Sequence, residues 1–152
     1  ESSASLTWPI TESLSIPVKV AYTYSQSEFQ NSFDSSFSQW GRVSAGDELP
    51  YLPQSQLSVE LGLQGPKWQV ALITKYLSAM SEAAGSNTEL EGLVTDELLQ
   101  IDLSSWYQVN ESLKFYGKVD NITNEQVITS RRPFGARPGK PMQAIVGVKY
   151  SF

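Results

Sequence analysis

The sequence contains no cysteine and no histidine. Without cysteine the chain can form no disulfide, no thiolate nucleophile and no cysteine-ligated zinc site. Without histidine it lacks the most common general base and the most common metal ligand of proteins. A phosphate-binding glycine loop is absent as well. We therefore expect a protein that is not an enzyme, with no catalytic residues, no metal site and no cofactor.

Charge and long apolar runs are also scarce. Charged residues make up 18% of the 152 residues, and the net charge of −5 argues against a nucleic-acid partner. No apolar run approaches the roughly 18 residues that a membrane-spanning helix requires, which argues against a helical membrane protein. The chain begins at Glu1, without an initiator methionine or a signal peptide, so we interpret it as a mature protein or a piece of a longer one.

What the sequence does contain is short segments in which apolar and polar residues alternate. The clearest is the segment 142–152, where every second residue is apolar and the residues between are mostly polar or small. Alternation of this kind gives a β-strand one apolar face. Its length matches the roughly 9–11 residues of a membrane-spanning strand, and two aromatic residues end the apolar face, where an interfacial girdle would lie. A half-buried strand of a soluble sandwich shows the same alternation.

The alternation recurs in six further segments, so we expect an all-β fold. The architecture that it predicts is an antiparallel up-and-down meander of about seven strands. The other expected strands cover about residues 4–8, 16–24, 56–64, 67–80, 99–109 and 113–120. The residues expected to face lipid are Val18, Tyr22, Leu57, Leu61, Val70, Leu103, Phe115, Val146 and Val148. The register is least certain in the segment 67–80, because Ile73 and Leu77 place apolar side chains on the otherwise polar face.

The connections between these strands alternate between short and long. Short breaks are expected near residues 9–15, 65–66 and 110–112, and long connections at about 25–53, 81–94 and 123–141. In an antiparallel meander this alternation places all short turns at one end of the sheet and all long loops at the other. Such segregation is typical of outer-membrane barrels, whereas a soluble sandwich has no need of it.

The first long connection carries Phe29, Phe33, Phe37 and Trp40 at helix-like spacing. One interpretation is a short amphipathic helical turn. The other, which we favour, is a loop whose aromatic side chains pack on its own base.

Several motifs add a resemblance that covers nearly the whole chain. The segments 121–124 (Asn-Ile-Thr-Asn) and 135–141 (Gly-Ala-Arg-Pro-Gly-Lys-Pro) resemble the end of the penultimate strand and the last loop of TonB-dependent outer-membrane receptors. The segment 45–53 (Ala-Gly-Asp-Glu-Leu-Pro-Tyr-Leu-Pro) resembles a loop base of the same family. Terminal Phe152, preceded at alternate positions by Tyr150 and Val148, resembles the signal that the barrel-assembly machinery reads.

This resemblance implies that residues 1–152 are the C-terminal portion of a longer receptor, and that their strands are the C-terminal part of its transmembrane β-barrel. Barrels of this class have 22 strands, and the family's N-terminal plug domain and energy-coupling box have no match in the sequence. The implied partners are the plug and remaining strands of the same receptor, the TonB complex acting through the plug, outer-membrane lipids and the barrel-assembly machinery. The implied function, in the bacterial outer membrane, is energised uptake of a scarce nutrient, with ferric chelates the usual ligands of the family.

A soluble all-β carbohydrate- or ligand-binding module is the competing interpretation. Such a module would use exposed aromatic side chains as stacking platforms, and the candidates are Trp40, Tyr51 and Trp106.

Four positive charges in the third long connection are the candidate ligand-binding residues: Arg131, Arg132, Arg137 and Lys140. Guanidinium groups bind carboxylates and phosphates in bidentate geometry, which would suit an anionic chelate or lipopolysaccharide phosphates. Along the chain only Glu125 offers a nearby acid. The alternative is a solvated loop whose arginines hydrogen-bond the loop's own carbonyl groups.

Two pairs of adjacent acids, Asp47–Glu48 and Asp96–Glu97, are the raw material of a glycosidase or calcium site. Adjacent residues in extended chain point in opposite directions, so we expect neither pair to converge.

Overall fold

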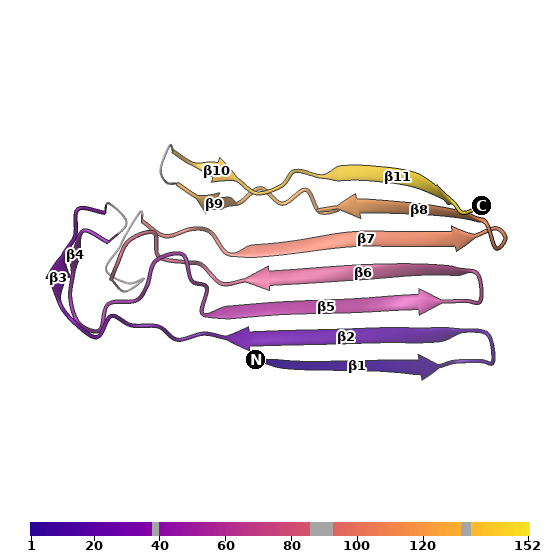
Figure 1. Ribbon diagram of the computed structural model, residues 1–152, viewed down its shortest axis with the longest axis horizontal. Coiled ribbons are helices and arrows are strands. Elements are labelled where there is room, and N and C mark those ends of the chain that lie inside the picture. The colour runs from indigo at the N-terminus through magenta and orange to yellow at the C-terminus, as the bar shows by residue number, and fades with distance from the viewer. Residues whose placement is uncertain (38–39, 86–92, 132–134) are drawn as a thin grey trace.

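The computed structural model describes residues 1–37, 40–85, 93–131 and 135–152. In this part of the chain, seven strands form one antiparallel sheet in which each strand lies beside its neighbours in sequence (Figure 1). The strands are β1 (Ser2–Pro9), β2 (Ser15–Tyr24), β5 (Ser55–Gln64), β6 (Trp68–Leu77), β7 (Leu98–Gln108), β8 (Leu113–Asp120) and β11 (Gln143–Tyr150). The predicted up-and-down meander is therefore confirmed.

Four shorter strands lie within the long connections. Strand β3 (Phe33–Asp34) pairs with β4 (Arg42–Val43), and β9 (Ile128–Ser130) pairs with β10 (Arg137–Pro138). Figure 1 shows both small pairs at one end of the sheet, and the short turns together with the C-terminus at the other end. The predicted segregation of short turns and long loops is thus observed. No helix in the described residues is long and apolar enough to cross a membrane.

The strand register keeps the apolar residues on one face. A single row of directly paired residues crosses the whole sheet: Leu6, Val18, Leu61, Leu72, Leu103, Val119 and Ala144. A slip of one residue would move a strand's whole apolar set to the other face, so every pairing in this row reinforces the same register. The register of β6, uncertain in the sequence, is settled by the pairing of Leu72 with Leu61 and Leu103, which turns Ile73 to the polar face.

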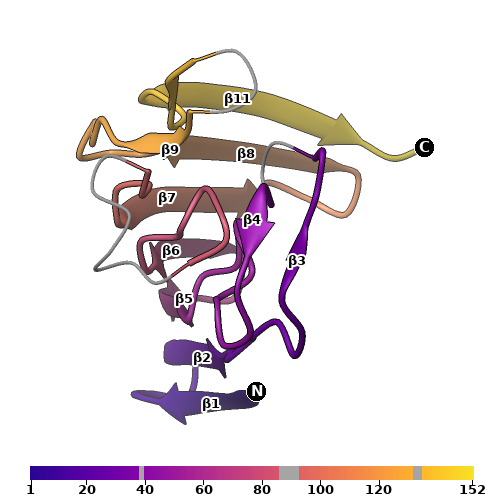
Figure 2. The ribbon, with the colours of Figure 1, turned by 90° about the vertical axis from the view of Figure 1, so that its left-hand side faces the viewer.

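The apolar face has nothing packed on it in the described part of the chain. Val146, Val148 and Leu61 are 87%, 56% and 51% exposed, and the described hydrophobic residues that are buried are Val43, Ala71 and Val127. Figure 2 shows the seven strands as one twisted layer. The accessible surface is 10093 Å². A compact protein of this mass would expose about 7,700 Å². The two-layer core that a soluble sandwich requires is not present in the described residues.

The long connections pack against one another beyond the end of the sheet. The Tyr51 N–H donates to the Ser81 carbonyl at 2.8 Å, and the Thr95 N–H donates to the Met80 carbonyl at 2.9 Å. Ser81 also forms an isolated bridge with Val94. The Tyr51–Ser81 bond joins the first long loop to the second, and the other two contacts close the base of the second loop.

The aromatic residues of the first loop pack edge to face, with Trp40 at the centre of the cluster. Its ring centroid lies 5.7 Å from that of Phe29, 5.9 Å from that of Phe33 and 5.7 Å from that of Phe37. No helix is assigned in the described residues of this loop, and the Phe37 carbonyl accepts the N–H groups of Trp40 and Gly41, each at 2.9 Å. The described part of the loop is therefore packed on its own aromatic side chains, as the favoured interpretation predicted.

Candidate functional site

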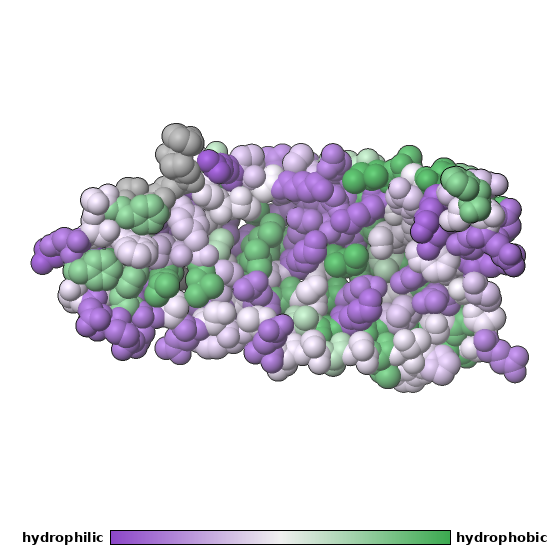
Figure 3. Space-filling view, in the orientation of Figure 1, coloured by the Kyte–Doolittle hydropathy of each residue, from purple (hydrophilic) through white to green (hydrophobic). Residues whose placement is uncertain are grey.

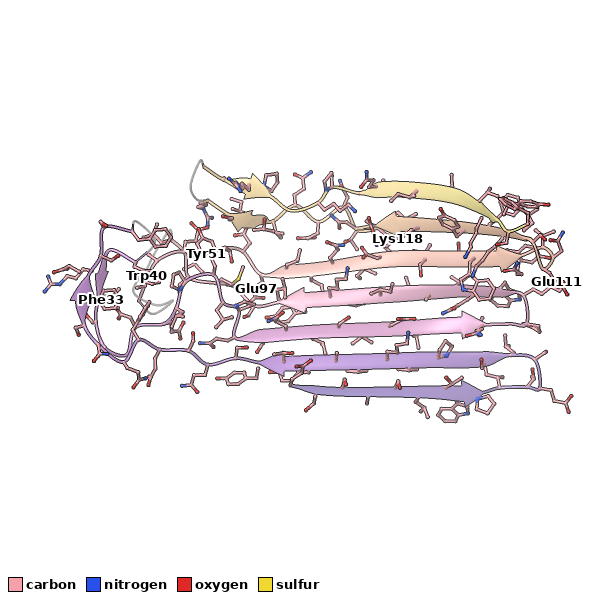
Figure 4. The ribbon with its side chains drawn as sticks, viewed as in Figure 1. Phe33, Trp40, Tyr51, Glu97, Glu111 and Lys118 are labelled. Atoms are coloured by element: carbon pink, nitrogen blue, oxygen red, sulfur yellow. The ribbon has the colours of Figure 1, made fainter. Side chains whose placement is uncertain are left out.

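Charged side chains gather on the polar face near the loop end of β8. Figure 3 shows strongly hydrophilic residues over the middle of the sheet, and Figure 4 labels Lys118 on β8. We call Lys75, Asp102, Lys118, Asp120 and Lys140 the charge cluster. Asp102 Oδ2 lies 3.2 Å from Lys75 Nζ and 3.8 Å from Lys118 Nζ. Asp120 forms ion pairs with Lys118 and Lys140.

The two carboxylates of the charge cluster are buried, whereas its three ammonium groups are partly exposed. Asp102 is 0% exposed and Asp120 is 2% exposed. A buried carboxylate is tolerated only with charge partners and hydrogen bonds, and both aspartates have them. Asp102 Oδ1 also accepts hydrogen bonds from Gln100 Nε2 at 2.6 Å and from the Asn121 N–H at 2.9 Å. The cluster therefore combines buried acids with partly exposed lysine side chains.

Asn121 connects the charge cluster to the loop between β8 and β11. Its φ of 51° lies in the left-handed region, which asparagine tolerates better than most residues. Its Nδ2 group donates to the carbonyls of Glu125 at 3.0 Å and Lys140 at 2.7 Å. Its Oδ1 accepts the Glu125 N–H at 3.0 Å. The family-like segment 121–124 is thus a tight turn that links both legs of the loop.

Arg131 is bound to the neighbouring loop rather than free. Its N–H donates to Glu82 Oε1 at 2.7 Å, its guanidinium lies 3.8 Å from the same oxygen, and it also donates to the Val94 carbonyl. Glu82 is 0% exposed. Along the chain only Glu125 stands near the four predicted cations, but the fold brings Glu82 to Arg131 and Asp120 to Lys140.

Arg137 behaves differently. It lies on β10, is exposed, and its guanidinium has no hydrogen-bond or ion-pair partner among the described residues. Its backbone carbonyl accepts a hydrogen bond from Thr129 Oγ1 at 3.3 Å. Arg132 lies outside the described residues. The predicted cations therefore divide: Arg131 and Lys140 hold buried acids, and Arg137 presents its charge to solvent.

The two adjacent acid pairs lie in different loops, where one aspartate of each pair accepts a hydrogen bond from a backbone N–H. Asp96 Oδ2 accepts the Ile128 N–H at 2.6 Å, and Asp47 Oδ2 accepts the Ser44 N–H at 2.7 Å. Within the described ranges, no three His, Cys, Asp or Glu side chains are placed to hold a metal ion.

The three aromatic candidates for a stacking platform do not come together. Figure 4 shows Trp40 and Tyr51 at the loop end. Trp106 pairs with Gln69 and Tyr116 towards the short-turn end of the sheet. Its Nε1 donates to Gln69 Oε1 at 2.9 Å, and Lys114 Nζ lies 4.0 Å from the ring centroid. A carbohydrate-binding platform made of these side chains is therefore not formed.

Aromatic residues form two bands on the apolar face. The sequence pattern predicted an aromatic girdle only at the end of the segment 142–152. The band at the short-turn end contains Trp8, Trp68, Tyr107, Phe115 and Tyr150, and the band at the loop end contains Tyr22, Tyr24 and Tyr76. On β6, Trp68 and Tyr76 are eight positions apart (76 − 68). That separation corresponds to ~26 Å along the strand.

Sequence reasoning also missed the charge cluster and Glu82. A signal was present, because lysines and aspartates alternate with apolar residues at the loop ends of β6, β7 and β8. Recognising the cluster required knowledge of which strands are neighbours and in what register. Val148 and Tyr150 lie on the apolar face as expected, whereas Phe152, expected to share that face, lies beyond the end of β11 and is fully exposed.

No protein-family model and no curated protein matched the sequence. Two solved structures are similar in fold. The ferric-catecholate import receptor Fiu from E. coli K12, in its closed form, matches with a TM-score of 0.69 and 20% identity, covering 99% of this chain and 20% of that chain. The siderophore receptor PiuA from Acinetobacter baumannii matches with a TM-score of 0.67 and 16% identity, covering 97% of this chain and 21% of that chain. The chain thus shares the fold of about a fifth of each receptor.

Proposed function

We propose that this chain is part of the barrel wall of an outer-membrane TonB-dependent receptor that takes up a ferric chelate. In this proposal residues 1–152 are its C-terminal portion, and the plug and remaining strands belong to the same polypeptide. The observation that carries the proposal is the largely apolar, charge-free face that crosses all seven strands of the sheet.

Lipid is the environment that this face fits best. Exposed apolar patches on soluble monomers rarely exceed a few hundred Å², whereas here the apolar row crosses every strand of the sheet. Aromatic bands border the face at both ends, as they do at the two interfaces of a membrane barrel. A strand tilt of about 40° reduces the ~26 Å between the bands to ~20 Å, close to the apolar height of about 25 Å in such barrels.

The two edges of the sheet support a larger assembly. In the described residues β1 pairs only with β2, and β11 pairs only with β8. Unpaired edges of long strands invite pairing with further strands, and a closed barrel removes them. We infer that further strands of the same receptor cover both edges in the complete barrel.

An anionic ferric chelate is the ligand class that we propose for the loop end. The similar structures are a ferric-catecholate import receptor and a siderophore receptor. Arg137 supplies an exposed guanidinium at this end of the sheet. Transport itself requires the plug and the TonB complex, so the described sheet contributes wall and loops rather than the gate.

The proposal is tested on the full-length product that contains this chain. We expect it to fractionate with the outer membrane, to require detergent for extraction, and to bind iron(III) tris-catecholate. The Arg137→Gln variant should bind this complex roughly tenfold more weakly, which corresponds to one lost charge-assisted hydrogen-bonding group. The matched control is Arg42→Gln, which removes another exposed arginine at the loop end.

Two outcomes would overturn the proposal. One is a full-length product that is a monodisperse monomer in buffer without detergent, which would favour the soluble binding module. The other is a membrane barrel whose affinity for iron(III) tris-catecholate is absent or the same for both arginine variants.

The assembly role of the C-terminus is a separate part of the proposal. Phe152 is fully exposed, and its ring centroid lies 6.4 Å from that of Tyr150. Deletion of Phe152 should lower the amount of receptor in the outer membrane, with unchanged ligand affinity in the molecules that assemble. Quantitative blotting of membrane fractions checks the yield, and a normal yield would contradict the role.

A further inference from the structure

We propose that Asp102 and Asn121 are positioning residues that fix both legs of the β8–β11 loop to the sheet and so set the place of Arg137. This inference rests on the proposed function where it concerns ligand binding. Its structural part, the order of the loop, stands independently of any ligand.

The outgoing leg is attached to β7. The Asn121 N–H donates to Asp102 Oδ1 at 2.9 Å, and the Ile122 N–H donates to the Ile101 carbonyl at 2.8 Å. Asp102 and Asn121 are buried, so solvent does not compete for the first of these bonds. The loop therefore begins from a fixed point on the neighbouring strand.

The returning leg is attached to the same turn. Asn121 Nδ2 donates to the Lys140 carbonyl at 2.7 Å, and the Met142 N–H donates to Asn124 Oδ1 at 3.1 Å. The Lys140 ammonium pairs with Asp120 at the end of β8. One asparagine side chain thus holds the two legs together immediately above the sheet.

From this base the contacts continue to Arg137. The Gly139 N–H donates to the Val127 carbonyl at 2.8 Å, and Arg137 pairs with Ser130 between β10 and β9. Asp96 and Ile128 exchange two hydrogen bonds that join the loop to its neighbour. These contacts connect Arg137 to Asn121 through the returning leg of the loop, with a register shift between Arg137 and Pro138.

Asp102 is the residue at the base of the loop whose hydrogen bond with the Asn121 N–H water cannot replace, because both residues are buried. Its Oδ1 accepts two hydrogen bonds, and its Oδ2 faces the ammonium groups of Lys75 and Lys118. Those lysines are 48% and 40% exposed, so water can solvate them if the aspartate is lost. The Asn121 N–H, in contrast, would lose its acceptor inside the structure.

The first experiment measures loop order in the full-length product by hydrogen exchange, without ligand. Asp102→Ala and Asn121→Gly should lower protection of the described parts of the loop about tenfold or more, because local opening controls exchange. Asn121→Gly keeps the left-handed backbone accessible and removes only the side-chain bonds. The control is Lys19→Met, which lies on the same face away from the loop. Unchanged protection in both test variants would overturn the proposal.

Asp102→Asn serves as the conservative variant. It keeps an oxygen acceptor for the Asn121 N–H and removes the charge. It should therefore keep most of the loop protection that Asp102→Ala loses. Equal loss in the two variants would assign the effect to charge rather than to the hydrogen bond and would contradict the positioning role described here.

The second experiment is a double-mutant cycle with iron(III) tris-catecholate as the probe. Asn121→Gly should weaken binding about fivefold in the wild-type background and have little effect in the Arg137→Gln background, because both act through the same guanidinium. Additive effects would show that the turn does not act through Arg137 and would overturn the ligand part. If wild-type receptor fails to bind the probe, the proposed function fails, whereas the exchange experiment still decides the positioning role.

Discussion

The two faces of the sheet come from the same seven strands but differ in which side chains they expose to solvent. On one face a row of leucine, valine and alanine side chains is largely open, and no charged residue lies among the strand positions that share it. On the other face the carboxylates of Asp102 and Asp120 are buried. A soluble protein normally shows the reverse, with apolar side chains inside and unburied acids. The comparison supports the proposal that lipid, rather than water, covers the apolar face.

The burial of acid on the polar face has a local cause. Lysine chains from neighbouring strands and from the β8–β11 loop lie over Asp102 and Asp120, and their aliphatic stems exclude water while their ammonium groups pair with the acids. The same face is open elsewhere: Lys19 and Glu60 form a 3.2 Å pair in which the lysine side chain is 63% exposed. The acids of the polar face are therefore buried near the long loops and solvated near β1 and β2.

The largest effect is expected from a charge on the apolar face. If the proposed lipid-facing assignment holds, Val146→Arg in the full-length product should cost roughly 2–4 kcal/mol of folding free energy in a bilayer, because the guanidinium would face hydrocarbon near the middle of β11. Ile145→Arg is the matched control, since it changes the adjacent residue on the opposite face. Denaturant titration in lipid vesicles measures both, and equal costs would show that the two faces have been assigned wrongly.

A smaller effect should separate the two regions of the polar face. Lys75→Met removes a partner of the buried Asp102 carboxylate and should destabilise the fold by about 1–2 kcal/mol, reduced from the value for a fully buried pair because Lys75 is half exposed. Lys19→Met breaks the exposed pair with Glu60 and should cost below about 1 kcal/mol.

Ionic strength sharpens that comparison. The cost of Lys19→Met should fall as salt is added, because exposed charges are screened, while the cost of Lys75→Met should change less. Unfolding midpoints measured at low and high salt check this. Equal salt dependence of the two costs would contradict the distinction between a region with buried acids and a solvated region.

An effect of similar size to those on the polar face is expected at Gly147 on β11. A Cβ added there would lie less than 3.0 Å from the ring of Tyr116 on β8, which covers this glycine from the neighbouring strand. Because Tyr116 is 47% exposed, its ring can swing away, so Gly147→Ala should cost about 1 kcal/mol. The cost should disappear in a Tyr116→Ala background, and a persistent cost would place its cause in the backbone instead. Thermal unfolding of the four variants in detergent is the measurement.

Much of the fold could be predicted from the sequence. The seven alternating segments, their order and the separation of short turns from long loops all agree with the structure. Strand alternation has a period of two and depends only on local residues, so it can be read without knowing any neighbour. The loop end was harder to predict from the sequence, because its short strands β3, β4, β9 and β10 have two or three residues each and carry no periodic pattern.

The candidate site was only partly predictable. Asn121 was identified through its motif, and Arg131 and Lys140 were identified as cations. Their acidic partners were not, because Glu82 lies 49 positions before Arg131 and Asp120 lies 20 positions before Lys140. The sequence therefore could not separate paired cations from the exposed Arg137.

The sequence by itself determined which side chains share a face, because each strand's alternation decides that strand by strand. Only the tertiary structure decided which charges meet across strands and loops. A cross-strand contact depends on the register between segments far apart in the chain, and a loop contact depends on where two such segments end. For that reason the apolar face was predictable from the residues, while the assignment of Asp102 and Asn121 to the base of the loop required the fold.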